Sequence, residues 1–338
     1  MKGCGCQSIY AAYEMCYNGM RNGARYMDIR ELKTLLLERY QVRKTEAQKQ
    51  AFIDWALAYA REREIPAHVE QSGTWIPSKN IVFGDVDHAY TIITAHYDTC
   101  ARMLLPNFST PGCMPLFVLE QTLLTGVIAL GGWICAKGAG WLLEGFLLPW
   151  MAVCLSIAFG LAGAALTLLL MLAGPANPHT ANDNTSGVLA VLLAMERMKD
   201  KRGVAFVLFD NEEKGLFGSL AFIKAHPQAA RRFLLNLDCV GDGDTMLYTG
   251  TKLSLKMPQA KRFYAALEEA AVQRDMRTAE GVFPKWIYPS DQMLFPRGTA
   301  AAALKGKRIL YLDRIHTARD TVLEEKNMEC LLEAMQEL

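Results

Sequence analysis

The feature that most constrains this chain is a long stretch without charge. Residues 145–177 contain no Asp, Glu, Lys or Arg. Within this stretch, the apolar run at 150–173 exceeds the about 20 residues that a helix needs to cross a bilayer. A second apolar run covers residues 117–136, where Glu120 and several glycines interrupt it. The sequence therefore predicts a helical hairpin whose two helices contact membrane lipid.

The predicted hairpin turns at its distal end, over residues 137–150, with a tight turn at Lys137–Gly140. Small residues recur along one face of the second helix, at Ser156, Gly160 and Ala164. Such spacing lets two helices approach closely in lipid. Two other interpretations stay open at this point. The hairpin could be a buried helical pair, or it could form a homo-oligomer interface in a soluble protein.

Outside the hairpin, the chain alternates between strand-like and helical segments. Short apolar runs predict strands at 80–83, 90–95, 203–209, 233–237, 245–248, 300–304 and 308–312. Helical patterns fill 28–63, 187–199, 216–231, 258–275 and 320–337. Continuous apolar strands that alternate with helices indicate a sheet covered on both faces. The expected fold is a three-layer α/β/α sandwich with a mostly parallel, mixed central sheet, interrupted by the inserted apolar hairpin.

Composition excludes several classes of protein. Lys and Arg number 36 against 35 Asp and Glu, for a net charge of +1, so no nucleic acid partner is expected. The nine cysteines form no CxxC pair, and free thiols fit a reducing compartment. Residues 1–30 contain no apolar segment of the kind that a secretory signal needs. We therefore expect a protein that is in the cytosol or faces it.

Metal-binding side chains gather where the predicted strands end. They are His96 and Asp98 after 90–95, Glu212 and Glu213 after 203–209, Asp238 after 233–237, His316 after 308–312, and Asp183 in a polar turn that follows the hairpin. In open α/β sheets the ligand crevice lies at the carboxyl ends of the strands. Imidazole and carboxylate without thiolate suit zinc in a catalytic site, with manganese or cobalt as alternatives.

These residues stand in six short motifs. The motifs are His96-Tyr-Asp98, Asn182-Asp183-Asn-Thr-Ser-Gly187, Glu212-Glu213-Lys-Gly-Leu-Phe-Gly-Ser219, Asn236-Leu-Asp238, Ser290-Asp-Gln292 and His316-Thr-Ala-Arg-Asp-Thr321. In this order they resemble the co-catalytic zinc aminopeptidases of metallopeptidase family 28, the aminopeptidase S and aminopeptidase Y type. The resemblance covers about residues 78–115 and 177–338, and the segment from Glu212 to Ser219 is its most specific part.

The resemblance implies two Zn²⁺ ions, with Mn²⁺ or Co²⁺ as alternatives. Asp183 would bridge the two ions. His96 and Asp238 would complete one site, and Glu213 and His316 would complete the other. Two such metals can polarise a scissile carbonyl and supply hydroxide near neutral pH.

The resemblance also implies two supporting roles. Glu212 would be the general base, and Asp98 would accept the second ring N–H of His96 and so fix its tautomer. The chain departs from the family pattern at Gln292, where the family often has histidine, and at Ile315, where several relatives carry tyrosine. Tyr288 is the substitute that we consider for an oxyanion-stabilising tyrosine.

The largest departure is the hairpin, which separates His96 from Asp183 by 87 positions. The predicted division is an N-terminal extension (1–27), a split metallopeptidase catalytic domain (28–115 and 175–338) and the inserted hydrophobic hairpin (116–174). Both ends of the hairpin belong to one domain, so they lie on the same side of any membrane. No signal is present to translocate the residues before the first span, so the catalytic domain is expected to face the cytosol.

The sequence therefore predicts a membrane-anchored metallo-aminopeptidase that removes N-terminal residues from peptide substrates. On the same fold, the alternatives are a glutaminyl cyclase-like transferase with a single zinc, and a carboxypeptidase or dipeptidase. The presence of both His96 and Asp238 favours two metals over one. A non-catalytic membrane scaffold is the alternative from a different class, and the presence of Glu212 and of every expected ligand argues against it.

Overall fold

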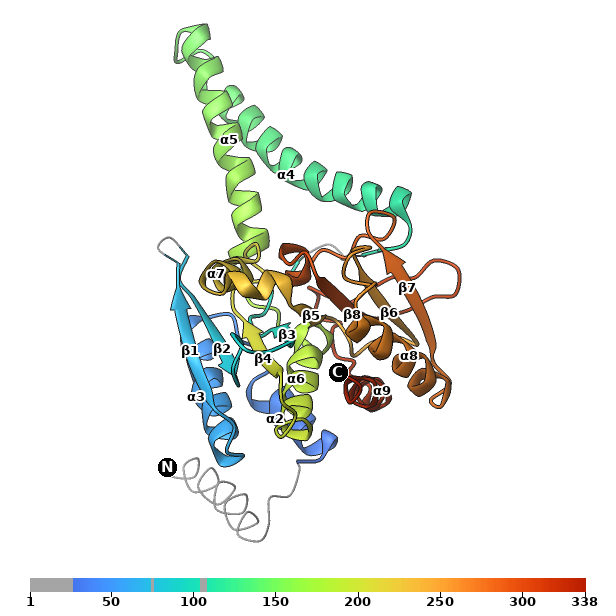
Figure 1. Cartoon of the computed structure of the whole chain (residues 1–338). Coiled ribbons are helices and arrows are strands. Elements are labelled where there is room, and N and C mark those ends of the chain that lie inside the picture. The colour runs from blue at the N-terminus through green and yellow to red at the C-terminus, as the bar shows by residue number, and fades with distance from the viewer. Residues whose placement is uncertain (1–26, 74–75, 104–107) are drawn as a thin grey trace, which may run out of the picture.

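The computed structural model describes residues 27–73, 76–103 and 108–338. Figure 1 shows a layered α/β body from which two long helices, α4 (Met114–Leu143) and α5 (Pro149–Ala173), project together. The predicted N-terminal extension, residues 1–27, lies outside the described residues apart from Met27. Element labels follow Figure 1.

An eight-stranded sheet forms the middle layer, in the order β1-β2-β4-β3-β5-β8-β6-β7. The strands are β1 (Ala67–Ser72), β2 (Ser78–Phe83), β3 (Thr91–His96), β4 (Val204–Phe209), β5 (Phe233–Leu237), β6 (Thr245–Gly250), β7 (Arg277–Val282) and β8 (Gly298–Leu304). The central strands β4, β3, β5 and β8 are parallel to one another, and β6 pairs in parallel with β7. The pairs β1–β2, β2–β4 and β6–β8 are antiparallel. The predicted mixed, mostly parallel sheet is confirmed.

Helices cover both faces of this sheet. One face carries α2 (Ile29–Arg39), α3 (Glu46–Glu62), α6 (Gly187–Arg197), α8 (Pro258–Val272) and α9 (Glu325–Met335), and the other carries α7 (Phe217–Ala225) with the short helices η2 (Pro227–Arg231) and η3 (Asp291–Leu294). Side chains of β4 alternate between the two cores: Phe206 and Leu208 pack on the first face, and Ala205 and Val207 on the second. This period of two is that of a strand buried on both sides. The three-layer prediction is confirmed.

The parallel centre of the sheet positions the candidate site. His96, the last residue of β3, pairs with Phe209 at the end of β4, and β5 runs parallel to β3 on its other side. The carboxyl ends of these three strands therefore lie at one edge of the sheet. The loops that follow the strands begin at that edge.

The two hairpin helices pack closely through small residues. A Cβ atom added at Gly132 would lie 2.8 Å from the carbonyl oxygen of Gly160 and 3.1 Å from Ala164 Cβ. A Cβ atom at Gly140 would lie 3.2 Å from Ser156 Oγ. The small-residue face that was predicted on the second helix is thus the face that contacts α4. Such close backbone approach is available only where side chains are absent or small.

The tight turn predicted at Lys137–Gly140 is wrong. Helix α4 continues through these residues to Leu143, and the chain turns at residues 144–148. Gly131, Gly132 and Gly140 of α4 lie in close contact with α5, whereas a Cβ atom added at Gly126 or Gly138 would have no neighbouring atom within 4 Å; none of these glycines ends the helix.

The hairpin exposes its apolar side chains to an unusual degree. Trp141 is 78% exposed, Phe146 84% and Leu161 69%. The most apolar windows of α4 and α5 are 0% and 6% buried inside the protein, and both helices are long and apolar enough to cross a membrane. The alternative of a helical pair buried in this chain's own core is therefore wrong, because the body leaves the hairpin uncovered.

Three local predictions also need correction. Residues 308–312 form only isolated bridges, between Lys305 and Tyr311 and between Ser109 and Leu312. They cannot join the sheet at β8, since β5 and β6 already occupy both edges of that strand. The helical patterns at 28–63 and 216–231 each divide in two. In the first, Thr45 starts a new helix through a capping box with Gln48, and in the second Pro227 starts a 3₁₀ turn.

Candidate metal centre

Three of the predicted ligands meet at the end of β3. His96 Nε2 lies 3.3 Å from Asp183 Oδ1 and 3.5 Å from Asp238 Oδ1. All three side chains are buried, and their ligand atoms lie within 4.8 Å of one another. This spacing is compatible with a single ion between one imidazole and two carboxylates.

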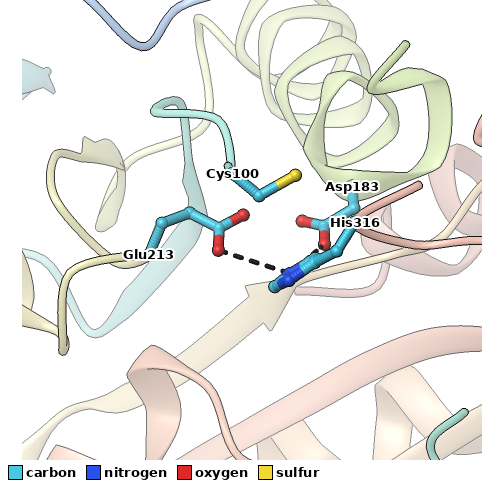
Figure 2. Close-up of side chains that lie close together, drawn as sticks. All are labelled: Cys100, Asp183, Glu213 and His316. Carbon is cyan, nitrogen blue, oxygen red and sulfur yellow. Dashed lines mark ion pairs between the residues drawn. The ribbon is translucent and has the colours of Figure 1, made fainter. Parts of the chain in front are cut away.

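A second group forms on the other side of Asp183. His316 Nε2 lies 3.0 Å from Asp183 Oδ2 and 3.3 Å from Glu213 Oε2. Figure 2 shows these three side chains converging, with the thiol of Cys100 beside them. The ligand atoms of all four residues lie within 4.8 Å of one another. Asp183 thus faces one group with Oδ1 and the other with Oδ2, as a bridging carboxylate must.

Asp183 is held in a tightly bonded turn. Asp183 lies in η1 (Ala181–Ser186), the segment between the hairpin and α6. The backbone N–H groups of Asn182 and Asp183 donate to the carboxylate of Asp320 at 2.7 and 3.0 Å. Asn182 Oδ1 in turn accepts the N–H of Gly241 at 2.7 Å. The Asp320 bonds fasten the turn to the segment after His316, and the Asn182 bond fastens it to the loop after β5, so hydrogen bonds between side chains and backbone hold Asp183 near Asp238.

Asp98 has a different contact from the one predicted. The ring nitrogen Nδ1 of His96 lies 3.1 Å from the backbone carbonyl oxygen of Asp98, whereas the nearest carboxylate oxygen is 3.6 Å away. The Asp98 carboxylate instead accepts the backbone N–H groups of Glu212 and Glu213 at 3.0 and 3.2 Å. Asp98 therefore still positions His96, through its carbonyl, but its side chain holds the Glu212-Glu213 pair.

Two of the buried carboxylates of the centre, Glu212 and Glu213, are unfavourable in their charged form. Burial first, and neighbouring carboxylates second, raise the pKa of Glu212 well above its usual range and the pKa of Glu213 to about 8. The pKa of His316 rises to about 9: burial opposes its charge, but Glu213 and Asp183 outweigh that effect. The concentrated acidic groups of the centre thus favour the binding of protons. A divalent cation at the same place would supply the positive charge instead.

Two oxygen atoms provide an independent test of whether metal fits this centre. Asp238 Oδ1 and Glu213 Oε1 are buried and have no hydrogen-bond partner. A buried carboxylate oxygen without a partner is costly, and coordination of a cation would remove that cost. The donor set of imidazole and carboxylate agrees with zinc chemistry, so the residues present fit a metal centre.

Sequence reasoning missed several residues that build this centre. Asp320 stands in a motif that was identified, but its two bonds to the Asp183 turn could not be assigned from spacing. Arg43 is fully buried; it donates to the backbone carbonyl of Tyr97 and, over 3.2 Å, to Thr185 Oγ1. Arg43 thereby connects the segment after β3 to the Asp183 turn. Cys100 was missed because the inventory counted only imidazole and carboxylate.

Gln292, which differs from the family pattern, and Tyr288, the substitute considered for the missing tyrosine, both have defined structural contacts. Tyr288 donates its hydroxyl to the backbone carbonyl of Asp238 at 3.0 Å, and it lines the cavity described below. Gln292 Nε2 donates to the carbonyl of Tyr288 at 2.6 Å, and its Oε1 accepts from Asn236 at 3.2 Å. Gln292 therefore fastens the Tyr288 segment to β5.

A cavity of about 590 Å³ opens over the metal centre. Its lining contains the predicted ligands and Glu212 together with residues at the base of the hairpin. The hairpin contributes Phe117, Glu120, Gln121, Leu124 and Leu172. The insertion thus does more than lengthen the chain beside the site, because it contributes five of the twenty residues that line the cavity.

The fold is similar to that of solved aminopeptidases and glutaminyl cyclases. The similar structures include LapA aminopeptidase of Legionella pneumophila, with TM-score 0.54, 13% identity and coverage of 99% of this chain and 72% of that one. A leucine aminopeptidase precursor of Bacteroides thetaiotaomicron has TM-score 0.54 and 14% identity, covering 93% and 97%. A glutaminyl cyclase of Porphyromonas gingivalis has TM-score 0.55 and 16% identity, covering 93% and 98%.

The sequence itself identifies the family. Residues 169–333 match the family described as Peptidase family M28, and this chain carries a peptidase family M28 domain. No curated protein matches the chain. The matched segment contains four of the five predicted ligands and Glu212. The fifth ligand, His96, lies outside this segment, and the fold brings it next to the others.

Proposed function

We propose that this protein is a two-zinc aminopeptidase that hydrolyses the N-terminal residue of peptides. The observation that supports the proposal best is the character of the cavity. Its described lining contains the carboxylates of Glu120, Glu212 and Glu213 together with the metal centre, and it includes no lysine or arginine. An exopeptidase must recognise a chain terminus, and an acidic cavity suits the ammonium of a free N-terminus.

We assign Glu120 as the residue that binds the ammonium group of the substrate. Glu120 lies near the start of α4 and lines the same cavity as the metal centre. Its Oε2 atom is buried without a hydrogen-bond partner. A carboxypeptidase would need a cation at this place to pair with a terminal carboxylate, so the same observation disfavours that alternative.

The metal ligands are assigned as two sets that share Asp183: His96 and Asp238 complete the first, and Glu213 and His316 the second. Bound zinc ions would polarise the scissile carbonyl and lower the pKa of the attacking water. Glu212 accepts a proton from that water as its oxygen bonds to the carbonyl carbon. The protonated Glu212 then donates to the leaving nitrogen as the C–N bond breaks.

Glutaminyl cyclase activity is the second candidate, because a glutaminyl cyclase is among the similar folds. The two reactions give different products from one substrate. With a peptide that begins with glutamine, an aminopeptidase releases free glutamine, whereas a cyclase releases ammonia and keeps the full number of residues. Mass spectrometry of this single reaction separates the candidates.

We also propose that the hairpin is inserted in a membrane and that the catalytic domain faces the cytosol. The support is the exposed apolar surface of α4 and α5, which is far larger than a soluble monomer presents to water. Membrane fractions from expressing cells should retain the protein after a carbonate wash and release it into detergent. Behaviour as a detergent-free monomer would contradict insertion, and a detergent-free oligomer would favour the homo-oligomer interface.

The test of the function uses the full chain in detergent with a matched pair of substrates. An aminoacyl p-nitroanilide with a free amine should be hydrolysed, and the same compound with an N-acetyl group should not. Chelation of metal should abolish the reaction, and Zn²⁺ or Co²⁺ should restore it. Equal hydrolysis of the free and the acetylated compound would refute the aminopeptidase assignment.

A further inference from the structure

Cys100 lies directly beside the second group of metal-binding residues. It follows β3 by four positions and is 1% exposed. Its sulfur belongs to the cluster in which the ligand atoms of Cys100, Asp183, Glu213 and His316 all lie within 4.8 Å of one another. In Figure 2 the thiol approaches the space between Glu213 and Asp183. The Cys100 sulfur is therefore placed as favourably for binding a metal ion as the ligand atoms of the other three residues.

The backbone holds this cysteine in place. The carbonyl of Cys100 accepts the N–H of Asn177 at 3.2 Å, and Arg102 donates to the carbonyl of Pro175 at 2.8 Å. Ala101 and Ala176 form an antiparallel bridge between these two contacts. The segment before the hairpin is thus paired with the segment after it, and this pairing fixes where the thiol lies.

A second observation in the same cluster points to a cation. The side chain of Glu213 is 8% exposed, and its Oε1 atom has no hydrogen-bond partner. The partner of its other oxygen, His316, is shared with Asp183. The cluster thus offers four donor atoms, and one of its buried carboxylate oxygens has no other partner. This arrangement is the one expected around a tetrahedral ion.

We propose that the Cys100 thiolate is a protein ligand of the metal ion held by Asp183, Glu213 and His316. This proposal rests on the metal centre of the proposed function, and it gives the two ions different numbers of protein ligands. The Cys100 site has four protein ligands and would expand its coordination to take water or substrate, whereas the site of His96, Asp183 and Asp238 has three ligands and keeps an open position. The thiolate also selects for zinc or cobalt over manganese or magnesium.

The experiment loads metal-free full-length protein, in detergent, with Co²⁺ and records its near-ultraviolet spectrum. A sulfur ligand produces a thiolate-to-cobalt charge-transfer band, which oxygen and nitrogen ligands do not. Cys100→Ser should lose this band and bind one of its two ions at least about 10-fold more weakly, since even residues that only support ligands cost that much.

Cys239 provides the matched control. It is also buried, at 2% exposure, and it lines the same cavity, but it is outside the cluster of Cys100. Cys239→Ser should keep the band and both ions. Retention of the band in Cys100→Ser, or its loss in Cys239→Ser, would overturn the assignment.

A measurement without substitution protects the test against a variant that fails to fold. X-ray absorption of the unmodified, zinc-loaded protein should show a Zn–S distance of about 2.3 Å. Two bound ions with only nitrogen and oxygen neighbours would refute the Cys100 ligand and leave the metal centre intact. Failure to bind any zinc or cobalt would refute the metal centre itself, so the two proposals fail in distinguishable ways.

Discussion

The carboxylate of Asp98 accepts the backbone N–H of Glu212 at 3.0 Å, across 114 positions of sequence. This hydrogen bond joins the loop after β3 to the loop after β4. Asp98 also presents its carbonyl to His96 at 3.1 Å. One residue therefore sets the position of a proposed ligand and of the proposed general base, and it couples the two from behind the residues that line the cavity.

Replacing Glu212 with glutamine should separate proton transfer from metal binding. We expect Glu212→Gln to keep both zinc ions and to lose about 10²–10⁴-fold in kcat, the usual contribution of a general base. Elemental analysis and steady-state kinetics measure the two effects. Glu213→Gln is the control, because it should lose metal as well as activity. Near-normal turnover in Glu212→Gln would show that another residue is the base.

Asp183→Ala should cost both ions, because this carboxylate faces His96 with one oxygen and His316 with the other. His316→Ala should weaken only the site that it shares with Glu213. Metal content after dialysis at a fixed free zinc concentration compares the two variants. Two zinc ions retained by Asp183→Ala would rule out its bridging role.

Glu120→Gln should weaken recognition of the substrate's free amine. Loss of a charged hydrogen bond costs about 1.5–3 kcal/mol, so kcat/KM for free-amine substrates should fall about 10- to 150-fold, with metal content unchanged. Glu144→Gln is a matched control at the distal end of the same hairpin, where α4 ends. An equal effect of both substitutions would mean that Glu120 acts through the hairpin fold.

Replacing residues 116–174 with a short Gly/Ser linker should give a protein that no longer needs detergent. It should still bind two metals, because every proposed ligand lies outside this segment. The lost cavity wall predicts a raised KM and a loss of discrimination against N-acetylated substrates. Aggregation of this variant in the absence of detergent would show that the body contains a further apolar surface.

His226 should make the stability of the body depend on pH. Burial opposes its charge, but its hydrogen bonds to Asp87 and Glu70, at 2.8 and 2.9 Å, outweigh burial and raise the pKa of His226 above 6.5. The stabilisation is complete below the unfolded-state pKa and is lost as pH rises through the folded-state value. His226→Gln should therefore lower the unfolding temperature more at about pH 6 than at about pH 9.

The control for His226 is His88→Gln. His88 makes a similar contact with Asp85, at 2.7 Å, but its side chain is 86% exposed. An exposed pair of this kind contributes little to stability. The two variants are compared by thermal unfolding in one detergent over the same pH series. A constant difference between wild type and His226→Gln at every pH would contradict the role of protonation.

Much of the fold could be predicted from the sequence because its signals are local. The buried central strands are continuous apolar runs. Helix α5 is uncharged over its whole length, and α4 carries only Glu120 and Lys137. The edge strands β1 and β7 escaped prediction, since their exposed residues are polar and leave no apolar pattern. Residues 308–312 were assigned to a strand on pattern alone, although pairing depends on a free edge that β8 does not have.

The sequence by itself determined which residues could bind metal, because residue type and order are enough to match a motif. Only the tertiary structure decided how they are held. Asp98 holds Glu212 and Glu213, Asp320 holds the Asp183 turn, and Cys100 stands beside His316, because separate loops converge at one edge of the sheet. Likewise, only the tertiary structure shows that Glu120, which belongs to an apolar helix, lines the acidic cavity. Distances between segments far apart in the chain arise from packing, and no local pattern encodes them.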